Sequence, residues 1–474
     1  MQKNDAIIFG AGPAGLAAAH KLTSNNKSIV IFEKENQVGG ISKTIKFKGY
    51  YFDLGGHRFF TKSKEVNDLW EKTLGDNFIE RPRLSRIYYK NKFFNYPLKP
   101  LNAFFGLGVI TSIKILFSYL IAKIFPSKQE RTFEQWVSNR FGKKLFQIFF
   151  KTYTEKLWGI SCNEIQAEWA AQRIKGLSLA IAIKNALLPS KNTAVKTLID
   201  KFKYPKYGPG MMYEKMAENI QKMNGKILME HKVIKINHAN FEIESILISN
   251  KDEKYEEYFA KDFISSMPIT TLVKNFSPPA PLEVIEAAKN LHYRSFISIS
   301  LILNSTKSFP DTWIYIHSSE VKMGRIQNFK KWSPYMVPDK NKTALGLEYF
   351  CTEGDELWNM QDEDLIKLGL QELEKIKLGK KSDFIDGFIA RVPKAYPIYD
   401  STYSKNIQII REYLDRFKNL YPIGRYGMFK YNNMDHSILT GLYSAENILG
   451  KNNHNIWQVN ADEEYHEEKK ATQK

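Results

Sequence analysis

The order of apolar and polar residues at the start of the chain predicts a β-α-β unit. Residues 6–9 (AIIF) and 28–34 (SIVIFEK) are short apolar runs that are typical of buried strands. Between them, GAGPAG is followed by LAAAHKL, which has the composition of a helix. The chain is therefore expected to begin as an α/β fold, with a buried parallel sheet covered by helices.

The pattern becomes helical after residue 100 and mixed after residue 226. Helical patterns cover residues 132–158 and 167–188, strand patterns lie within residues 226–266, and strands then alternate with helices up to residue 449. The expected parts are a discontinuous α/β domain of residues 1–100, 201–268 and 401–450, a helical domain of residues 101–200, a mixed-sheet domain of residues 269–400 and a polar tail of residues 454–474.

The composition is that of a folded globular protein with a basic surface. The chain has 474 residues, of which 43% are hydrophobic and 25% charged, and it is too long for one ordinary core. Lys and Arg number 69 and Asp and Glu number 51, so the net charge is +18, which favours nucleotides, phosphates, nucleic acid or an acidic membrane as partners. Cys162 and Cys351 exclude a disulfide framework, and the histidines lack the spacing of metal ligands, so we expect no metal site.

The segment LNAFFGLGVITSIKILFSYLIAKIF, residues 101–125, has the length of a membrane span, but Lys114 and Lys123 interrupt it. We therefore expect a buried helix pair or a helix lying in the membrane interface rather than a span. The N-terminus starts a strand almost at once, without the charged-then-apolar layout of a signal peptide. The expected localisation is cytoplasmic, with peripheral membrane contact through residues 101–125 as an alternative.

A glycine-rich loop lies between the first strand and the first helix. The spacing of Gly10, Gly12 and Gly15 matches G-x-G-x-x-G, and Glu33 ends the next strand. Such glycines let the backbone approach a pyrophosphate, the helix N-terminus stabilises the anion, and the acid accepts hydrogen bonds from a ribose. The residues expected to contact the dinucleotide here are Gly10, Gly12, Pro13, Ala14, Gly15, Glu33 and Lys34. A second pair, Gly39 and Gly40, is typical of FAD proteins of the glutathione-reductase-like superfamily.

Further motifs give a resemblance over nearly the whole chain. These are FDLGGHRFFT at residues 52–61, YYKNKFFNYPLKP at 88–100, YTEKLWG at 153–159, AYPIYD at 395–400 and GRYGMFKYNNMDHSILTGL at 424–442. In this order they resemble the UDP-galactopyranose mutase family, within the amine-oxidase and protoporphyrinogen-oxidase superfamily of flavoproteins. The resemblance implies FAD as cofactor and a glutathione-reductase-like Rossmann domain, with an inserted helical domain and a mixed or antiparallel sheet as substrate domain.

The resemblance also implies roles for residues around the flavin. Gly55 and Gly56 would let the backbone lie against the ring, where a Cβ would collide. His57 would act near the reactive edge of the flavin as a catalytic residue, with Phe59 and Phe60 shielding the ring. The remaining expected cofactor contacts are Arg58, Val233, Arg425 at the pyrophosphate, and Asp435, His436 and Ser437 at a helix start that stabilises the anionic reduced flavin.

On the substrate side, the resemblance implies isomerisation of a nucleotide sugar by a reduced flavin, with no net redox change. Such an enzyme must grip a diphosphate, which calls for arginines and tyrosine hydroxyls. The candidates are Arg325, expected also to be catalytic, and Tyr153, Trp158, Tyr396 and Tyr431. The family's second arginine is missing, since its place is taken by Lys203 or by Leu177, and a lysine cannot form the bidentate phosphate fork.

Three functions stay open on the sequence alone. The first is a mutase-like isomerase of a nucleotide sugar in polysaccharide biosynthesis. The second is an FAD-dependent oxidoreductase of the amine-oxidase, protoporphyrinogen-oxidase or desaturase type, in which residues 101–125 form an apolar entrance. The third is a non-enzymatic binder, for which the lysines and aromatics of KFKYPKY are the sole signal; the chain has no recognisable nucleic-acid module, so we expect no nucleic-acid partner. Oligomeric state is undecided, with a homodimer as one option.

Overall fold

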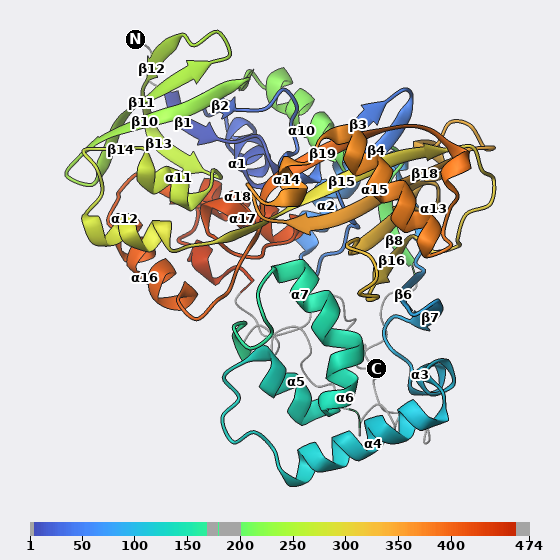
Figure 1. Ribbon diagram of the computed structural model, residues 1–474. Helices are drawn as coiled ribbons and strands as arrows, with labels where there is room; N and C mark the ends of the chain where they lie inside the picture. Colours follow the sequence, from blue (N-terminus) through green and yellow to red (C-terminus); the bar gives the residue numbers. More distant parts are fainter. Residues whose placement is uncertain (1–3, 168–178, 180–200, 461–474) are drawn as a thin grey trace, which may run out of the picture.

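A parallel five-stranded sheet contains both the first and the last strand of the described chain. The computed structural model describes residues 4–167, 179 and 201–460 (Figure 1). The strand order of this sheet is β20-β13-β1-β2-β9. Its strands are β1 (Asn4–Phe9), β2 (Ile29–Glu33), β9 (Lys226–Met229), β13 (Ala260–Ser265) and β20 (Leu420–Pro422). The two apolar runs predicted from the sequence therefore pair as neighbouring parallel strands, Ala6 beside Ile29.

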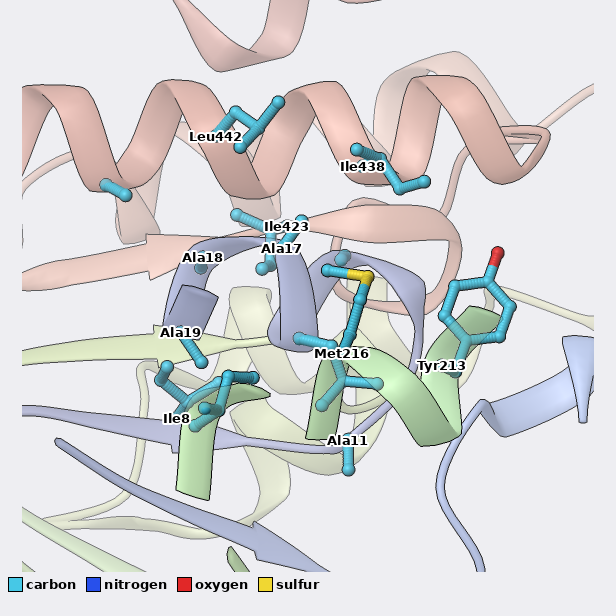
Figure 2. Packing of buried hydrophobic residues seen from close by; sticks show 14 of the residues in the cluster. Ile8, Ala11, Ala17, Ala18, Ala19, Tyr213, Met216, Ile423, Ile438 and Leu442 are labelled. Carbon is cyan, nitrogen blue, oxygen red and sulfur yellow. The ribbon is translucent and has the colours of Figure 1, made fainter. Parts of the chain in front are cut away.

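Three helices pack on one face of this sheet. They are α1 (Pro13–Thr23), α10 (Gly210–Lys222) and α18 (Met434–Ile448). Figure 2 shows the alanines of α1 between Ile438 and Leu442 of α18 on one side and Met216 of α10 on the other. A Cβ on Gly441 would lie 2.1 Å from the carbonyl oxygen of Ala14, so only glycine lets α18 approach α1 this closely. The last long helix is thereby fixed beside the first.

The opposite face of the sheet carries a second, mixed sheet, in which only β10 and β14 pair in parallel, and further helices. The second sheet has the order β12-β11-β10-β14. The elements of this layer are β10 (His231–Ala239), β11 (Glu242–Asn250), β12 (Tyr255–Tyr258), β14 (Phe276–Ser277), α11 (Ile269–Lys274), α12 (Leu282–Lys289) and α16 (Tyr403–Leu414). Residues of α11 and α12 share one apolar core with β1 and β2. The predicted boundary at residue 269 is thus too early, because this stretch packs with the α/β domain.

The mixed-sheet domain is built on seven strands in the order β19-β15-β18-β17-β16-β6-β7. Its strands are β6 (Ser85–Tyr89), β7 (Lys92–Asn95), β15 (Tyr293–Leu303), β16 (Trp313–Ile316), β17 (Arg325–Asn328), β18 (Thr343–Cys351) and β19 (Phe384–Pro397), and α15 (Asp362–Lys375) packs against it. From their place in the sequence, residues 85–95 are predicted to belong to the α/β domain. That assignment is wrong, because β6 pairs with β16, in parallel, through a contact of high sequence separation.

The helical domain lies below the sheets in Figure 1. Its described helices are α3 (Pro100–Leu107), α4 (Val109–Ile124), α5 (Phe133–Phe141), α6 (Lys143–Phe146) and α7 (Thr152–Trp158), with a π-helical turn at Gln147–Lys151. The apolar segment 101–125 is a helix pair, broken at Gly108, whose φ is +84°. Only part of it is buried, since most of its outer side chains are exposed. Among the described residues, no helix has the length and apolar character needed to cross a membrane.

Candidate functional site

A large cavity lies where the three parts of the chain meet. Its volume is about 2960 Å³, and its wall includes the glycine loop, residues 56–58, the end of β19, the start of α18, and α3, α4 and α7. A pocket for one small ligand usually measures about 300–1,000 Å³. The cavity therefore has room for a dinucleotide and for a second molecule beside it.

The glycine loop forms the dinucleotide end of this cavity. Gly10 has a φ of +98°, which L side chains rarely adopt, and a Cβ on Gly15 would lie 2.0 Å from the carbonyl oxygen of Gly10. Gly12 is the N-cap of α1 and makes no side-chain cap, while Pro13 occupies the first turn. The first N–H groups of α1 therefore remain available to an anion in the cavity, as the motif predicts.

Glu33 is placed beside this loop by the end of β2. Its Oε2 accepts a hydrogen bond of 2.7 Å from the backbone N–H of Ala11, and Oε1 accepts one of 3.0 Å from the N–H of Glu35. Burial raises the pKa of Glu33, which these two hydrogen bonds partly offset. The other expected contacts that line the same cavity here are Ala14, Lys34, Gly40 and Val233.

Gly39 does not line the cavity, and its role is to shape the backbone beside the glycine loop. Its φ is +102°, and its N–H donates to the carbonyl of Ala11 over 2.8 Å. The pair Gly39 and Gly40 thereby turns the chain back over the glycine loop. A Cβ on Gly12 would lie 3.9 Å from the Cα of Gly40, so the two backbones come into contact.

The loop after β4 (Tyr50–Asp53) brings His57 to the wall of the cavity. The N–H of His57 donates to the carbonyl of Gly55 over 3.0 Å, which makes a tight turn. A Cβ on Gly56 would lie 3.1 Å from Nε2 of Gln327, so the loop packs closely on β17. Burial, then the charges of Arg425 and Arg325, lower the pKa of His57 to about 3. The imidazole is therefore neutral near pH 7, and its Nδ1 has no hydrogen-bond partner among the described residues.

The residues after His57 have different surroundings. Arg58 and Phe60 line the cavity. Phe59 instead packs on Trp70 of α2 (Lys64–Leu74), with ring centroids 4.3 Å apart. The expectation that Phe59 shields the flavin ring is corrected by this contact, because Phe59 belongs to the core beside α1.

Residues between Gly424 and Ser437 form a further part of the cavity wall. Asn433 caps α18, and His436 Nδ1 accepts a hydrogen bond of 3.3 Å from the N–H of Asn433. Asp435 and Ser437 line the cavity, whereas His436 is not part of its wall. The predicted helix start is thus correct to within one residue, and His436 acts there as a capping residue.

A buried ion pair lies where β17 forms the wall of the cavity. Arg325, on β17, lies 2.6 Å from the carboxylate of Glu348 on β18 and donates to the hydroxyl of Tyr396 on β19 over 2.7 Å. Burial alone would lower the pKa of Arg325, but Glu348 and the neighbouring tyrosines raise it well above its usual value. Gln327 donates to the second oxygen of Glu348 over 2.6 Å and thereby fixes the carboxylate.

Two tyrosines and a second arginine extend this cluster. The rings of Tyr396 and Tyr431 stack with centroids 5.8 Å apart, and the guanidinium of Arg425 lies 4.6 Å from the centroid of the Tyr431 ring. Arg425 is held by the carbonyls of Asn432 and Ala395 at 2.9 and 3.0 Å. The charge of Arg425 therefore lies beside Tyr431 in the cavity wall. The resemblance implies that Arg425 contacts the pyrophosphate, and this contact stays a prediction.

The YTEKLWG motif contributes from α7. Trp158 is buried, with its ring centroid 6.2 Å from that of Tyr396 and 6.4 Å from that of Tyr431. Tyr153 lines the cavity and stacks on His317 at 4.8 Å. The motif therefore supplies three residues of the cavity wall, Tyr153, Thr154 and Leu157, and Trp158 packs beside the tyrosine pair. Their contact with a substrate stays a prediction.

The structure corrects the expectation for Lys203. This residue lies on β8 (Lys201–Pro205), and its ammonium pairs with Glu71 of α2 at 2.5 Å. It is outside the cavity wall, because the pairing of β8 with β5 (Phe78–Pro82) directs its side chain to α2. Leu177, the other candidate for that place, lies outside the described residues.

Sequence reasoning missed Glu348 and Gln327. Both are buried polar residues that reach the cluster through neighbouring strands. A signal was present, since a single glutamate in the apolar run ALGLEYF is costly to bury without a partner. The described residues contain no group of His, Cys, Asp and Glu that could hold a metal ion.

These features fit FAD. The bent glycine loop, the uncapped start of α1 and the buried Glu33 suit its adenosine and pyrophosphate, and His57 lines the same cavity. The fold and the site together define an FAD-binding flavoprotein. The family described as flavin containing amine oxidoreductase matches residues 13–449, and the chain belongs to this family.

Solved structures agree on the fold across nearly the whole chain. A reduced UDP-galactopyranose mutase aligns with a TM-score of 0.83 at 20% identity, covering 97% of this chain and 98% of that one. A putative protoporphyrinogen oxidase from Exiguobacterium sp. 255-15 aligns with a TM-score of 0.71 at 18% identity, covering 95% and 100%. At these identities the likeness shows the fold.

Curated relatives match over shorter stretches. UDP-galactopyranose mutase of Mycoplasma pneumoniae is 25% identical over 34% of this chain and 42% of its own length. A 1-hydroxycarotenoid 3,4-desaturase of Flavobacterium sp. is 24% identical over 51% of this chain and 53% of its own length. The chain thus spans about half, or less, of the curated relatives it is similar to.

Proposed function

We propose that the chain, with FAD bound, isomerises a nucleotide sugar in polysaccharide biosynthesis. The observation that carries this proposal is the cluster of Arg325, Arg425 and Tyr431 in the cavity wall, with Tyr396 hydrogen-bonded to Arg325 and stacked on Tyr431. Guanidinium and phenol donors that converge in a buried site suit the oxygens of a diphosphate. Structural likeness to a reduced UDP-galactopyranose mutase is consistent with this reading.

Charge balance makes the cluster suited to hold and release an anion. Arg325 and Arg425 carry two positive charges, and Glu348 carries one negative charge, so one positive charge is left for a ligand. Glu348 and Gln327 also fix the guanidinium of Arg325 before the ligand arrives, which lowers the entropy cost of binding. A diphosphate would then replace solvent at preformed donors.

The flavin, when bound and reduced, supplies electron density to the substrate carbon. The chain's own residues prepare its surroundings. The N-terminus of α18, with Ser437 in the cavity wall, would stabilise negative charge on a flavin held in the cavity. The neutral imidazole of His57, in the cavity wall, carries one hydrogen-bond donor and one acceptor without adding charge. Gly56 lines the cavity and packs against Gln327, and Gly55 lies beside the ring of His57.

Binding of UDP to the dithionite-reduced holoprotein under anaerobic conditions tests the proposal. We expect saturable binding that weakens at least about thirtyfold in Arg325→Met, since a charge-assisted contact is lost. Arg86→Met is the matched control, because Arg86 also forms a buried pair, with Asp311 at 2.6 Å, but lies outside the cavity wall. Equal loss in both variants, or no binding to the wild type, would contradict the proposal.

A second function is favoured by the apolar part of the cavity. Leu98, Leu107, Leu145 and Phe149 line the region between the tyrosine cluster and α3 and α4. Such a wall suits the hydrocarbon portion of a lipophilic substrate of an FAD-dependent oxidoreductase. That enzyme would consume an electron acceptor in every turnover, whereas an isomerase consumes none, so acceptor consumption separates the two.

A further inference from the structure

Helices α3 and α4 present an apolar surface that no other described part of the chain covers. Figure 1 shows the pair along the outer edge of the helical domain. Its outward apolar side chains are exposed, from 40% for Phe104 to 77% for Phe125. We call this surface the α3–α4 face; it includes Leu101, Phe105, Ile110, Ile113, Phe117 and Ile124. Single-chain globular proteins rarely expose a contiguous apolar patch of this kind.

The exposed apolar residues of α4 do not lie on the side of the helix that packs against the rest of the protein. Ile115 and Tyr119 of α4 are buried against α5 and α6, while Ile110, Ile113 and Phe117 recur on the opposite side at helical spacing. Helix α4 is thus apolar on both sides. Its 16 residues extend about 24 Å, which is shorter than a bilayer core of about 30 Å. A helix of this kind suits a position in the plane of a membrane surface.

The charges around the α3–α4 face indicate what kind of partner it binds. The chain has no Asp or Glu between Glu80 and Glu130. Lys99, Lys114 and Lys123 are exposed in or beside α3 and α4, and none forms an ion pair with a described carboxylate. Anionic phospholipid headgroups complement these charges. A second copy of the chain, joined through the same face, would bring the same lysines together and repel them.

We propose that the α3–α4 face binds an anionic membrane surface, with its apolar side chains among the acyl chains and its lysines at the headgroups. Leu101, Ile113 and Leu116 belong to this face and also line the cavity that reaches His57. Membrane binding therefore places the apolar end of the cavity at the lipid. This inference does not depend on whether the reaction is isomerisation or net oxidation.

Flotation of the full-length holoprotein with vesicles tests it. The vesicles are phosphatidylcholine with about 30% phosphatidylglycerol, and pure phosphatidylcholine for comparison. We expect flotation with the anionic vesicles, and at least about tenfold weaker partition in a Phe105→Ser, Ile110→Ser, Phe117→Ser triple variant, whose changed residues do not line the cavity. Leu282→Ser is the matched control, because this leucine of α12 is exposed at 73% and far from the face.

A second pair of variants separates charge from apolar contact. Lys114→Glu with Lys123→Glu should weaken binding to the anionic vesicles by about fivefold or more for each lysine, and added salt should weaken the wild type. Unchanged flavin content and melting temperature show that each variant folds. No flotation of the wild type, or equal flotation of the triple variant, would overturn the proposal. So would a wild-type dimer that the triple variant dissociates, since the face would then be a subunit interface.

Discussion

Replacing Arg325 with methionine should destabilise the protein far more than its cavity position alone suggests. Glu348 is almost fully buried, with 1% of its side chain exposed, and Arg325 is its cationic partner at 2.6 Å. Removing one member of a buried pair leaves an uncompensated charge, which costs about 3–5 kcal/mol. Because 18% of the Arg325 side chain is exposed toward the cavity, water can reach the site, and we expect a loss near the lower end, about 3 kcal/mol.

A double variant isolates the cause of that loss. In Arg325→Met with Glu348→Gln, the buried charge is gone, and the amide that replaces the carboxylate keeps an oxygen for the N–H of Gln327, which now bonds to Glu348 over 2.6 Å. We expect the double variant to recover to within about 1 kcal/mol of the wild type. Nucleotide binding should stay lost in both variants, because neither has the guanidinium.

Equilibrium urea unfolding, followed by circular dichroism, measures these differences. Arg86→Met is again the control, since it unpairs Asp311, which is fully buried, and should lower stability similarly without affecting UDP. If Arg325→Met is as stable as the wild type while Arg86→Met is not, Glu348 does not depend on Arg325 and the described cluster is wrong. If the double variant is no better than the single one, the loss does not come from an unpaired charge.

Three further variants test the backbone and the titrating groups. Gly15→Ala should prevent folding of the first β-α-β unit, because its Cβ would lie 2.0 Å from the oxygen of Gly10, whereas Gly12→Ala should fold but hold less FAD; flavin content and melting temperature distinguish them. Burial raises the pKa of Asp53 from 3.8 to about 7, so the folded state binds the extra proton, and stability should fall by up to about 4 kcal/mol as the pH rises from about 4 through 7. Asp53→Asn should flatten this dependence of stability on pH. If the stability of the variant falls with pH as steeply as that of the wild type, Asp53 is not its cause. Since the pKa of His57 is lowered to about 3, its ring proton signals should not titrate by NMR between about pH 5 and 8, and a midpoint in that range would contradict the described burial.

The parts of the fold that were predictable from sequence are those with local signals. The strands β1 and β2 are continuous apolar runs, and the glycine spacing sets the turn before α1 through contacts within a few residues. The helix start at residue 434 carries its own capping residues. These features depend on neighbours in the chain and so appear in the sequence.

The features that sequence reasoning missed depend on distant pairing. β6 and β7 look like part of the first domain until β6 meets β16, more than two hundred residues later. Glu348 shows its role only when β17 brings Arg325 beside it. Lys203 matched a family position in the sequence, but strand pairing directs it to Glu71. Periodicity reports which face of an element is buried, and not which element covers it.

The most direct test of the proposed function is the stoichiometry of turnover. The reduced holoprotein is incubated anaerobically with a panel of UDP-hexoses, and the products and the remaining reductant are both measured. We expect an isomeric UDP-sugar to form over many turnovers with no reductant consumed, and this product to be lost in Arg325→Met but not in Arg86→Met. If no isomer forms, and turnover instead requires an electron acceptor and a lipophilic substrate, the proposed isomerase function is contradicted.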